Sequence, residues 1–253
     1  MSSTTKICAS GAVKVSTSGN NVVFTVGTGK KAGKVTVQKA KGKTITYFIG
    51  DNEYVYPKPD DVKYNSAGTA ATLKSTYGKD KFEPSNYSDY FNTLVTINAS
   101  AVKHSLQITG NKNANKITGT SEDDNINGGD AGDTIFGGFG NDKLYGDKGN
   151  DSLSGGAGDD SLWGGEGSDT LTGGAGSDVF YYEAGDGNDV ITDYSPGLDT
   201  VLILSGKVGG YTTSKSDVTF KIGNGQITFK NAIDKRIELV DREGNQLKQY
   251  DSN

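Results

Sequence analysis

The chain has 253 residues and a net charge of −5; 33% of its residues are apolar, 37 are glycine and one is cysteine. This length allows about two domains, but so few apolar residues argue against one large hydrophobic core, and the glycine excess is typical of short strands joined by tight turns. One cysteine excludes an intramolecular disulfide, so we expect a bound metal to hold the fold together.

The N-terminal residues, MSSTTKICASGAVKVS, contain neither an apolar core segment nor a cleavage pattern, and no run in the chain approaches 18 apolar residues. We therefore expect no signal peptide and no membrane span. The protein then stays in the cytosol or is exported by a route that needs no N-terminal signal.

Two segments, residues 22–51 and 218–241, share an alternating strand, a Gly-x-Gly turn, a second strand, a Lys-rich turn and a third strand. This pattern predicts small antiparallel β-modules that cap a central region, since a repetitive fold must have its open ends covered. The connector before the centre is expected to become solenoid-like from Leu94 to Ile108. The expected division is an N-terminal β-module (1–56), a connector with degenerate turns (57–109), a central repeat (110–193) and a C-terminal β capping module (194–253).

The central region repeats every nine residues. Each repeat places an aspartate two residues before an apolar residue. The aspartates are Asp124, Asp133, Asp142, Asp151, Asp160, Asp169 and Asp178, and the apolar residues are Ile126, Ile135, Leu144, Leu153, Leu162, Leu171 and Phe180. Ile108 and Ile117 continue the phase upstream, with Asn115 in place of an aspartate. Seven aspartates in register with seven apolar residues argue against a flexible Gly/Asp-rich linker.

The repeat unit reads G-G-x-G-x-D-x-U-x, as in GGFGNDKLY (137–145) and GGAGDDSLW (155–163). Two units depart from it, at Ala131 and at Asp147. This pattern resembles the RTX (repeats-in-toxin, hemolysin-type calcium-binding) family. The resemblance implies an all-β fold, a parallel β-roll or right-handed β-solenoid with calcium between its turns.

Two units would make one turn of a flattened coil, so each apolar residue stacks on the one eighteen residues away, in strands about 4.8 Å apart. The glycines at positions one, two and four are expected to adopt positive φ and turn their carbonyls inward. Calcium takes about six to eight oxygen ligands, more than one such turn supplies, so each ion needs two stacked turns. Five complete sites are expected, at the pairs 124/142, 142/160, 160/178, 133/151 and 151/169. Asn115 with Asp133 gives a weaker sixth, and Asp189 a marginal one where the roll ends.

The family's scheme implies that the aspartates bridge neighbouring turns while carbonyl oxygens near the first and fourth repeat positions complete each calcium shell. The glycines expected to serve are Gly119, Gly128, Gly137, Gly140, Gly146, Gly149, Gly155, Gly158, Gly164, Gly167, Gly173 and Gly176. The site served by Ala131 is expected to be weaker, because alanine fits a positive φ less well.

Gly119 to Asp193 holds 17 acidic residues and only two lysines, Lys143 and Lys148, whereas the rest of the chain carries 24 basic and 14 acidic residues. Such a block repels itself and is expected to stay disordered until cations neutralise it. Nucleic acid is an unsuitable partner for it.

Three functions remain open from the sequence. The first is a calcium-binding structural or adhesive segment of a large, repetitive bacterial surface or secreted protein; the resemblance implies type I secretion, an extracellular or cell-surface location and folding on calcium. The second is an accessory module of a secreted enzyme. No catalytic constellation occurs, and no Cys, Asp or Ser lies at a recognisable catalytic spacing from His104, so the chain itself is expected not to be an enzyme. The third is a glycan-binding module that uses the aromatic column Tyr145, Trp163 and Tyr181. For the column itself we favour the simpler interpretation, in which it stacks against a flanking module or packs as a ladder. We expect a monomer.

Overall fold

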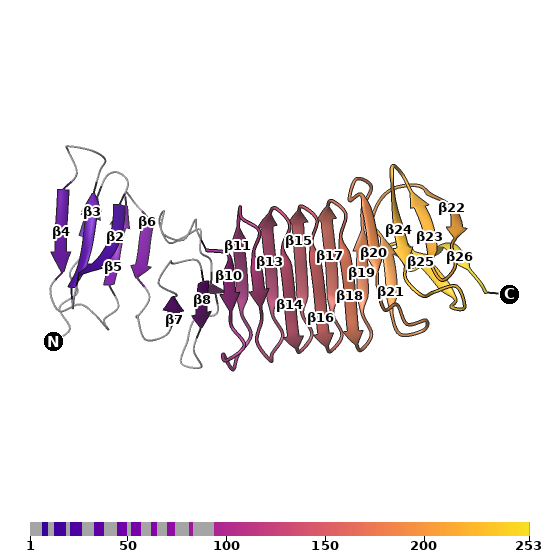
Figure 1. Ribbon diagram of the computed structural model, residues 1–253, viewed down its shortest axis with the longest axis horizontal. Coiled ribbons are helices and arrows are strands. Elements are labelled where there is room, and N and C mark those ends of the chain that lie inside the picture. The colour runs from indigo at the N-terminus through magenta and orange to yellow at the C-terminus, as the bar shows by residue number, and fades with distance from the viewer. Residues whose placement is uncertain are drawn as a thin grey trace.

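The computed structural model describes residues 70–73, 81–82 and 94–252 with their side chains, and elsewhere only the strands at 7–9, 13–18, 21–26, 33–37, 45–49, 52–56 and 62–64. Among these residues there are strands and no helix, which confirms the all-β expectation (Figure 1). The described part accordingly offers no helix long and apolar enough to span a membrane.

Two parallel sheets form the walls of an elongated roll, and consecutive strands alternate between them (Figure 1). The first sheet contains β10 (Thr96–Asn98), β12 (Lys116–Thr118), β14 (Thr134–Phe139), β16 (Ser152–Ala157), β18 (Thr170–Ala175) and β20 (Asn188–Ile191). The second contains β11 (Gln107–Asn111), β13 (Asn125–Asp130), β15 (Lys143–Lys148), β17 (Ser161–Glu166), β19 (Val179–Tyr182) and β21 (Thr200–Ile203). The prediction of a parallel β-roll is therefore confirmed.

The register between neighbouring turns is eighteen residues, as the period predicts. In the second sheet Ile126 pairs with Leu144, and Leu144 with Leu162. In the first sheet Ile135 pairs with Leu153. All these side chains are buried, so each wall contributes one apolar column to a narrow core.

Parallel pairing begins earlier than expected, because β8 (Ala70–Leu73) and β9 (Lys81–Phe82) pair in parallel with β10 and β11. In the first sheet β7 (Val62–Tyr64) follows as an antiparallel edge strand. The roll therefore extends upstream of residue 94. The intervening parts of the predicted connector lie outside the described residues.

The C-terminal strands continue both walls of the roll. They are β22 (Val208–Thr213), β23 (Val218–Ile222), β24 (Gly225–Phe229), β25 (Ile237–Val240) and β26 (Gln246–Tyr250). β24 pairs in parallel with β20, and β25 with β21, while β23 and β26 turn back in antiparallel hairpins. The antiparallel hairpins thus end the parallel coil, and a separate C-terminal capping module stays a prediction.

Near the N-terminus the strands form two small sheets. One has the order β1 (Ile7–Ala9), β5 (Ile45–Ile49), β6 (Asn52–Tyr56), and the other β2 (Val13–Ser18), β3 (Asn21–Val26), β4 (Gly33–Val37). β3 and β4 pair in antiparallel orientation, as expected, and β23 and β24 pair in the same way. The two segments that share a sequence pattern thus share a hairpin.

Candidate metal centres

The turns between strands owe their shape to glycine at the second and fourth repeat positions, where φ is positive. Gly138 and Gly140, for example, have φ of 131° and 103°. Ala131 and Asp147 adopt the same region, with φ of 71° and 72°, although neither is glycine. These two turns therefore keep the common shape with some backbone strain.

The first glycine of each repeat does not have positive φ, so that expectation was wrong. Its role is steric: a Cβ on Gly155 would overlap the Asp160 carboxylate, and one on Gly137 that of Asp142. The same holds for Gly128, Gly146, Gly164 and Gly173. The first position thus needs glycine because the aspartate five residues later fills the space of its missing side chain.

The aspartates form two continuous rows along the roll. The backbone N–H of each donates to Oδ1 of the aspartate one turn later, for example Asp142 to Asp160 at 2.8 Å and Asp133 to Asp151 at 2.6 Å. One row runs through Asp124, Asp142, Asp160 and Asp178, and the other through Asn115, Asp133, Asp151, Asp169 and Asp189. The structure therefore brings the five predicted aspartate pairs together, and it places Asp189, for which no partner was predicted, beside Asp169.

In the middle of these rows the second carboxylate oxygen has no partner. Oδ2 lacks any hydrogen-bond donor in Asp133, Asp142, Asp151, Asp160, Asp169 and Asp178, all of which are at most 2% exposed. Leaving a charged oxygen buried and unpaired costs several kcal/mol. Six such oxygens in two rows fit a set of cations, and carboxylate oxygens are hard ligands of the kind that calcium prefers.

The electrostatics of the rows show the same deficit of positive charge. Burial raises the pKa of Asp133, Asp142 and Asp169 to about 7 and that of Asp160 to about 6. The nearby carboxylate of the neighbouring turn adds to each rise, against the lowering effect of the donated N–H. A divalent cation between turns would remove both penalties.

The turns at the ends of the rows behave differently. The N–H of Thr120 donates to Asp124 Oδ2 at 2.6 Å, and the N–H of Asn111 donates to Asn115 Oδ1 at 2.9 Å. At the far end Asp199, which the sequence reading missed, accepts the Asp178 N–H at 3.1 Å and the Ser195 N–H at 2.7 Å. Here the protein's own backbone satisfies the side-chain oxygens.

A second ladder, also missed from the sequence, lies at the fifth repeat position. The N–H of Asn141 donates to Asp123 Oδ1 at 2.7 Å, and that of Asp159 to Asn141 Oδ1 at 2.8 Å. The donation runs from the later turn to the earlier one, opposite to the aspartate rows. The frequent Asn or Asp at this position was the available signal, and it links neighbouring turns without a metal.

No cluster of three or more His, Cys, Asp or Glu side chains suited to a metal occurs among the residues that the structure describes. A metal held by these rows would therefore need oxygen ligands in addition to the paired aspartates, and main-chain carbonyls of the glycine-rich turns are the predicted source. The choice of glycine carbonyl oxygens that would coordinate the metal stays a prediction.

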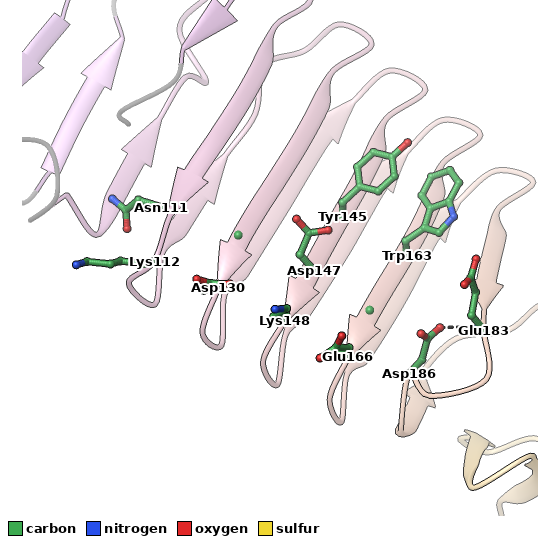
Figure 2. A pocket seen from close by; sticks show the side chains of 12 residues that line it. Asn111, Lys112, Asp130, Tyr145, Asp147, Lys148, Trp163, Glu166, Glu183 and Asp186 are labelled. Carbon is green, nitrogen blue, oxygen red and sulfur yellow. Dashed lines mark hydrogen bonds between the residues drawn. The ribbon is translucent and has the colours of Figure 1, made fainter. Parts of the chain in front are cut away.

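The outer face of the second sheet carries the aromatic column. Tyr145 stacks on Trp163 with ring centroids 4.5 Å apart, and Trp163 on Tyr181 at 3.9 Å. Figure 2 shows Tyr145 and Trp163 side by side on neighbouring strands. Both faces of the Trp163 ring are thus covered, which favours the stacking-ladder interpretation of this column.

A trough of about 560 Å³ borders this column (Figure 2). Three lining residues, Gly129, Asp147 and Gly165, are paired with one another on neighbouring strands. Because two of them are glycines, no side chain fills the trough at their positions. Asp147 reaches into it and accepts the Asn127 Nδ2–H at 2.6 Å. The trough therefore has aromatic edges on one side, and within it lies the carboxylate of Asp147, a residue whose backbone has positive φ.

Comparison with protein families identifies the repeats. Residues 109–144, 118–153 and 145–180 match the family model of the RTX calcium-binding nonapeptide repeat (4 copies). The match covers both aspartate rows up to Asp178, whereas Asp189 and Asp199 lie beyond it. No curated protein matches the chain.

Two solved structures resemble the chain. The extracellular lipase LipA from Serratia marcescens is 16% identical, with a TM-score of 0.27, over 90% of this chain and 30% of the lipase chain. The AlgE6R3 subunit of the Azotobacter vinelandii mannuronan C5-epimerase is 24% identical, with a TM-score of 0.24, over 44% of this chain and 71% of that one. The chain thus spans less than a third of the lipase.

Proposed function

We propose that this chain, whose central turns are RTX calcium-binding repeats, is a non-catalytic structural or adhesive segment of an exported bacterial protein that folds on binding about five calcium ions outside the cell. The observation that carries the proposal is the set of six buried aspartate oxygens without donors. When bound, calcium would supply the positive charge that these oxygens lack.

The chain's own residues supply the other parts of the calcium sites. Aspartates eighteen residues apart bring carboxylates from two turns together, and glycines at the second and fourth positions bend the backbone around the space between them. Without cations the 17 carboxylates of the acidic block repel one another, which opposes compaction. The same chain is therefore expanded at low calcium and a compact rod at high calcium.

The free energy of calcium binding would be large enough to decide whether the roll folds. Extracellular calcium modules have Kd values of about 10⁻⁴ to 10⁻³ M. At ten times Kd each site would contribute about 1.4 kcal/mol, or roughly 7 kcal/mol for five sites. This is comparable with the whole stability of a typical domain. A chain that crosses a membrane unfolded at low calcium and folds outside, as in type I secretion, agrees with this balance.

The test is a far-UV circular dichroism titration with calcium from a chelated start, paired with calorimetry. We expect a cooperative rise in β signal with about five ions bound. A full β signal in chelator would contradict calcium-dependent folding, and failure to bind calcium would overturn the proposed function.

The trough beside Tyr145 and Trp163 favours glycan binding as a second candidate, with ring edges and Asp147 facing the sugar hydroxyls. A glycan-array screen should compare the parent with Trp163→Ala and Asp147→Gly. The second variant restores the repeat glycine and so keeps the turn while removing the carboxylate. Loss of a glycan signal in both variants, with the roll intact, would support this candidate.

A further inference from the structure

The turns of the roll fall into two classes that the repeat pattern alone does not separate. In one class the second-position residue has positive φ; these turns end at Asp133, Asp142, Asp151, Asp160, Asp169, Asp178 and Asp189. In the other class the second-position residues, Asn111, Thr120 and Ser195, do not have positive φ. We call the two classes open and closed turns.

The N–H of the second-position residue explains the difference. In the closed turns this N–H points inward and donates to the side chain four residues later, as Thr120 does to Asp124 and Ser195 to Asp199. In six open turns that carboxylate oxygen has no donor. A positive φ at the second position turns the N–H away, and the oxygen is left for another partner.

The turn that ends at Asp189 belongs to the open class, although Asp189 follows Asp169 by 20 residues and not by 18. Gly185 and Gly187 of its turn have φ of 112° and 106°, the values of the regular repeats. Asp189 is 2% exposed, and the described residues give it one hydrogen bond, accepted by Oδ1 from the Asp169 N–H at 3.1 Å. Its turn therefore shares the backbone shape and the aspartate-to-aspartate hydrogen bond of the open turns, although its Oδ2 is not one of the six buried oxygens without a donor.

We propose that the closed turns are metal-free caps in which a main-chain N–H takes the place of calcium, so that the ion array is displaced by one position toward the C-terminus relative to the regular repeat. Pairs of adjacent open turns are 142/160 and 160/178 in one row and 133/151, 151/169 and 169/189 in the other. Asp189 holds an ion together with Asp169, whereas Asp124 holds none despite its regular spacing. This assignment rests on the proposed function.

Two matched variants of the full chain, Asp189→Ala and Asp124→Ala, test the assignment. Calcium alone is the probe, its bound number is read by native mass spectrometry, and circular dichroism checks that the roll is folded. We expect five ions in the parent, four in Asp189→Ala and five in Asp124→Ala. The milder change Asp124→Asn covers the case in which the alanine variant fails to fold.

Loss of an ion from Asp124→Ala or Asp124→Asn, or five ions retained by Asp189→Ala, would overturn the assignment while the proposed function stands. A parent that binds no calcium would instead overturn the proposed function. The two failures are therefore distinguishable.

A gain-of-site variant tests the role of the Thr120 N–H directly. Thr120→Gly with Glu122→Gly changes the turn to G-G-S-G-D-D, which allows positive φ at both required positions. We expect a sixth ion, at the pair 124/142. Thr120→Ala keeps the N–H and serves as the control, with five ions expected. A folded double variant that still binds five ions would overturn the cap mechanism.

Discussion

The central and the terminal turns of the roll follow one path and stack in the same rows, yet they satisfy their buried side-chain oxygens in opposite ways. Asp160 keeps an oxygen without a donor, whereas Asp124 receives the Thr120 N–H. In the first kind of turn the oxygen needs a partner from outside the chain, whereas in the second kind a main-chain N–H already supplies it. Under the assignment proposed above, dependence on calcium is thus a property of individual turns, and single residues decide it.

The largest expected effect separates the two regions by removing calcium. Amide protons of β14 to β18 should lose protection by up to roughly five orders of magnitude, the equivalent of about 7 kcal/mol. The antiparallel hairpin of β23 and β24, which contains no aspartate row, should lose much less. Hydrogen exchange with and without chelator measures both. Equal loss in the two regions would show that the roll and its cap unfold as one unit.

Within the central region, position in a row should set the number of ions lost. Asp160 belongs to two open pairs, so Asp160→Ala should lose two ions. Asp142 belongs to one, so Asp142→Ala should lose one. Asp199→Ala, in a closed turn, should lose none. Native mass spectrometry counts the ions, and equal losses from the first two variants would contradict the pairing.

A side chain added at the first glycine of a central repeat should lower the free energy of unfolding by roughly 1 to 3 kcal/mol, the usual cost of overpacking. A Cβ at Gly155 would overlap the Asp160 carboxylate, so Gly155→Ala should lower both calcium affinity and thermal stability. Gly210→Ala is the matched control, because nothing lies within 4 Å of its Cβ and its φ is not positive. Similar melting temperatures for both variants would contradict the steric role.

The smallest expected effect concerns the strained central turn at Ala131. Ala131→Gly should raise the free energy of unfolding by about 0.5 to 1 kcal/mol in saturating calcium, because glycine adopts a φ of 71° without steric cost. Gly140→Ala is the reverse change at the fourth position of the next nine-residue repeat, and it should be destabilising. Urea unfolding compares them, and a destabilised Ala131→Gly would contradict the strain.

The sequence predicts most of the roll because a strict period of nine determines which residues pair. The stacking of Ile126 on Leu144 and the alignment of Asp142 with Asp160 both follow from it. Prediction failed where the period breaks. Asp199 lies 21 residues after Asp178, so counting misses it although the structure places it in the same row.

Other features needed backbone geometry. The first glycine was expected to have positive φ, but what it provides is space for a carboxylate, which becomes visible only once the aspartate is positioned. The attachment of β24 to β20 was equally inaccessible, because no repeat connects Gln226 with Asn188. The hairpin itself follows from local alternation, whereas its parallel docking depends on contacts across the whole fold.

The eighteen-residue register has a consequence for how such a protein can change in length. Removal of 146–163 would join two turns of identical phase, so every remaining strand would stay in its own wall and the rod would become about 4.8 Å shorter. Removal of only nine residues would move all later strands to the opposite wall, and the irregular end turns would no longer meet their partners. Gene segments encoding two repeats are therefore the smallest pieces that duplication or deletion can exchange without changing the architecture.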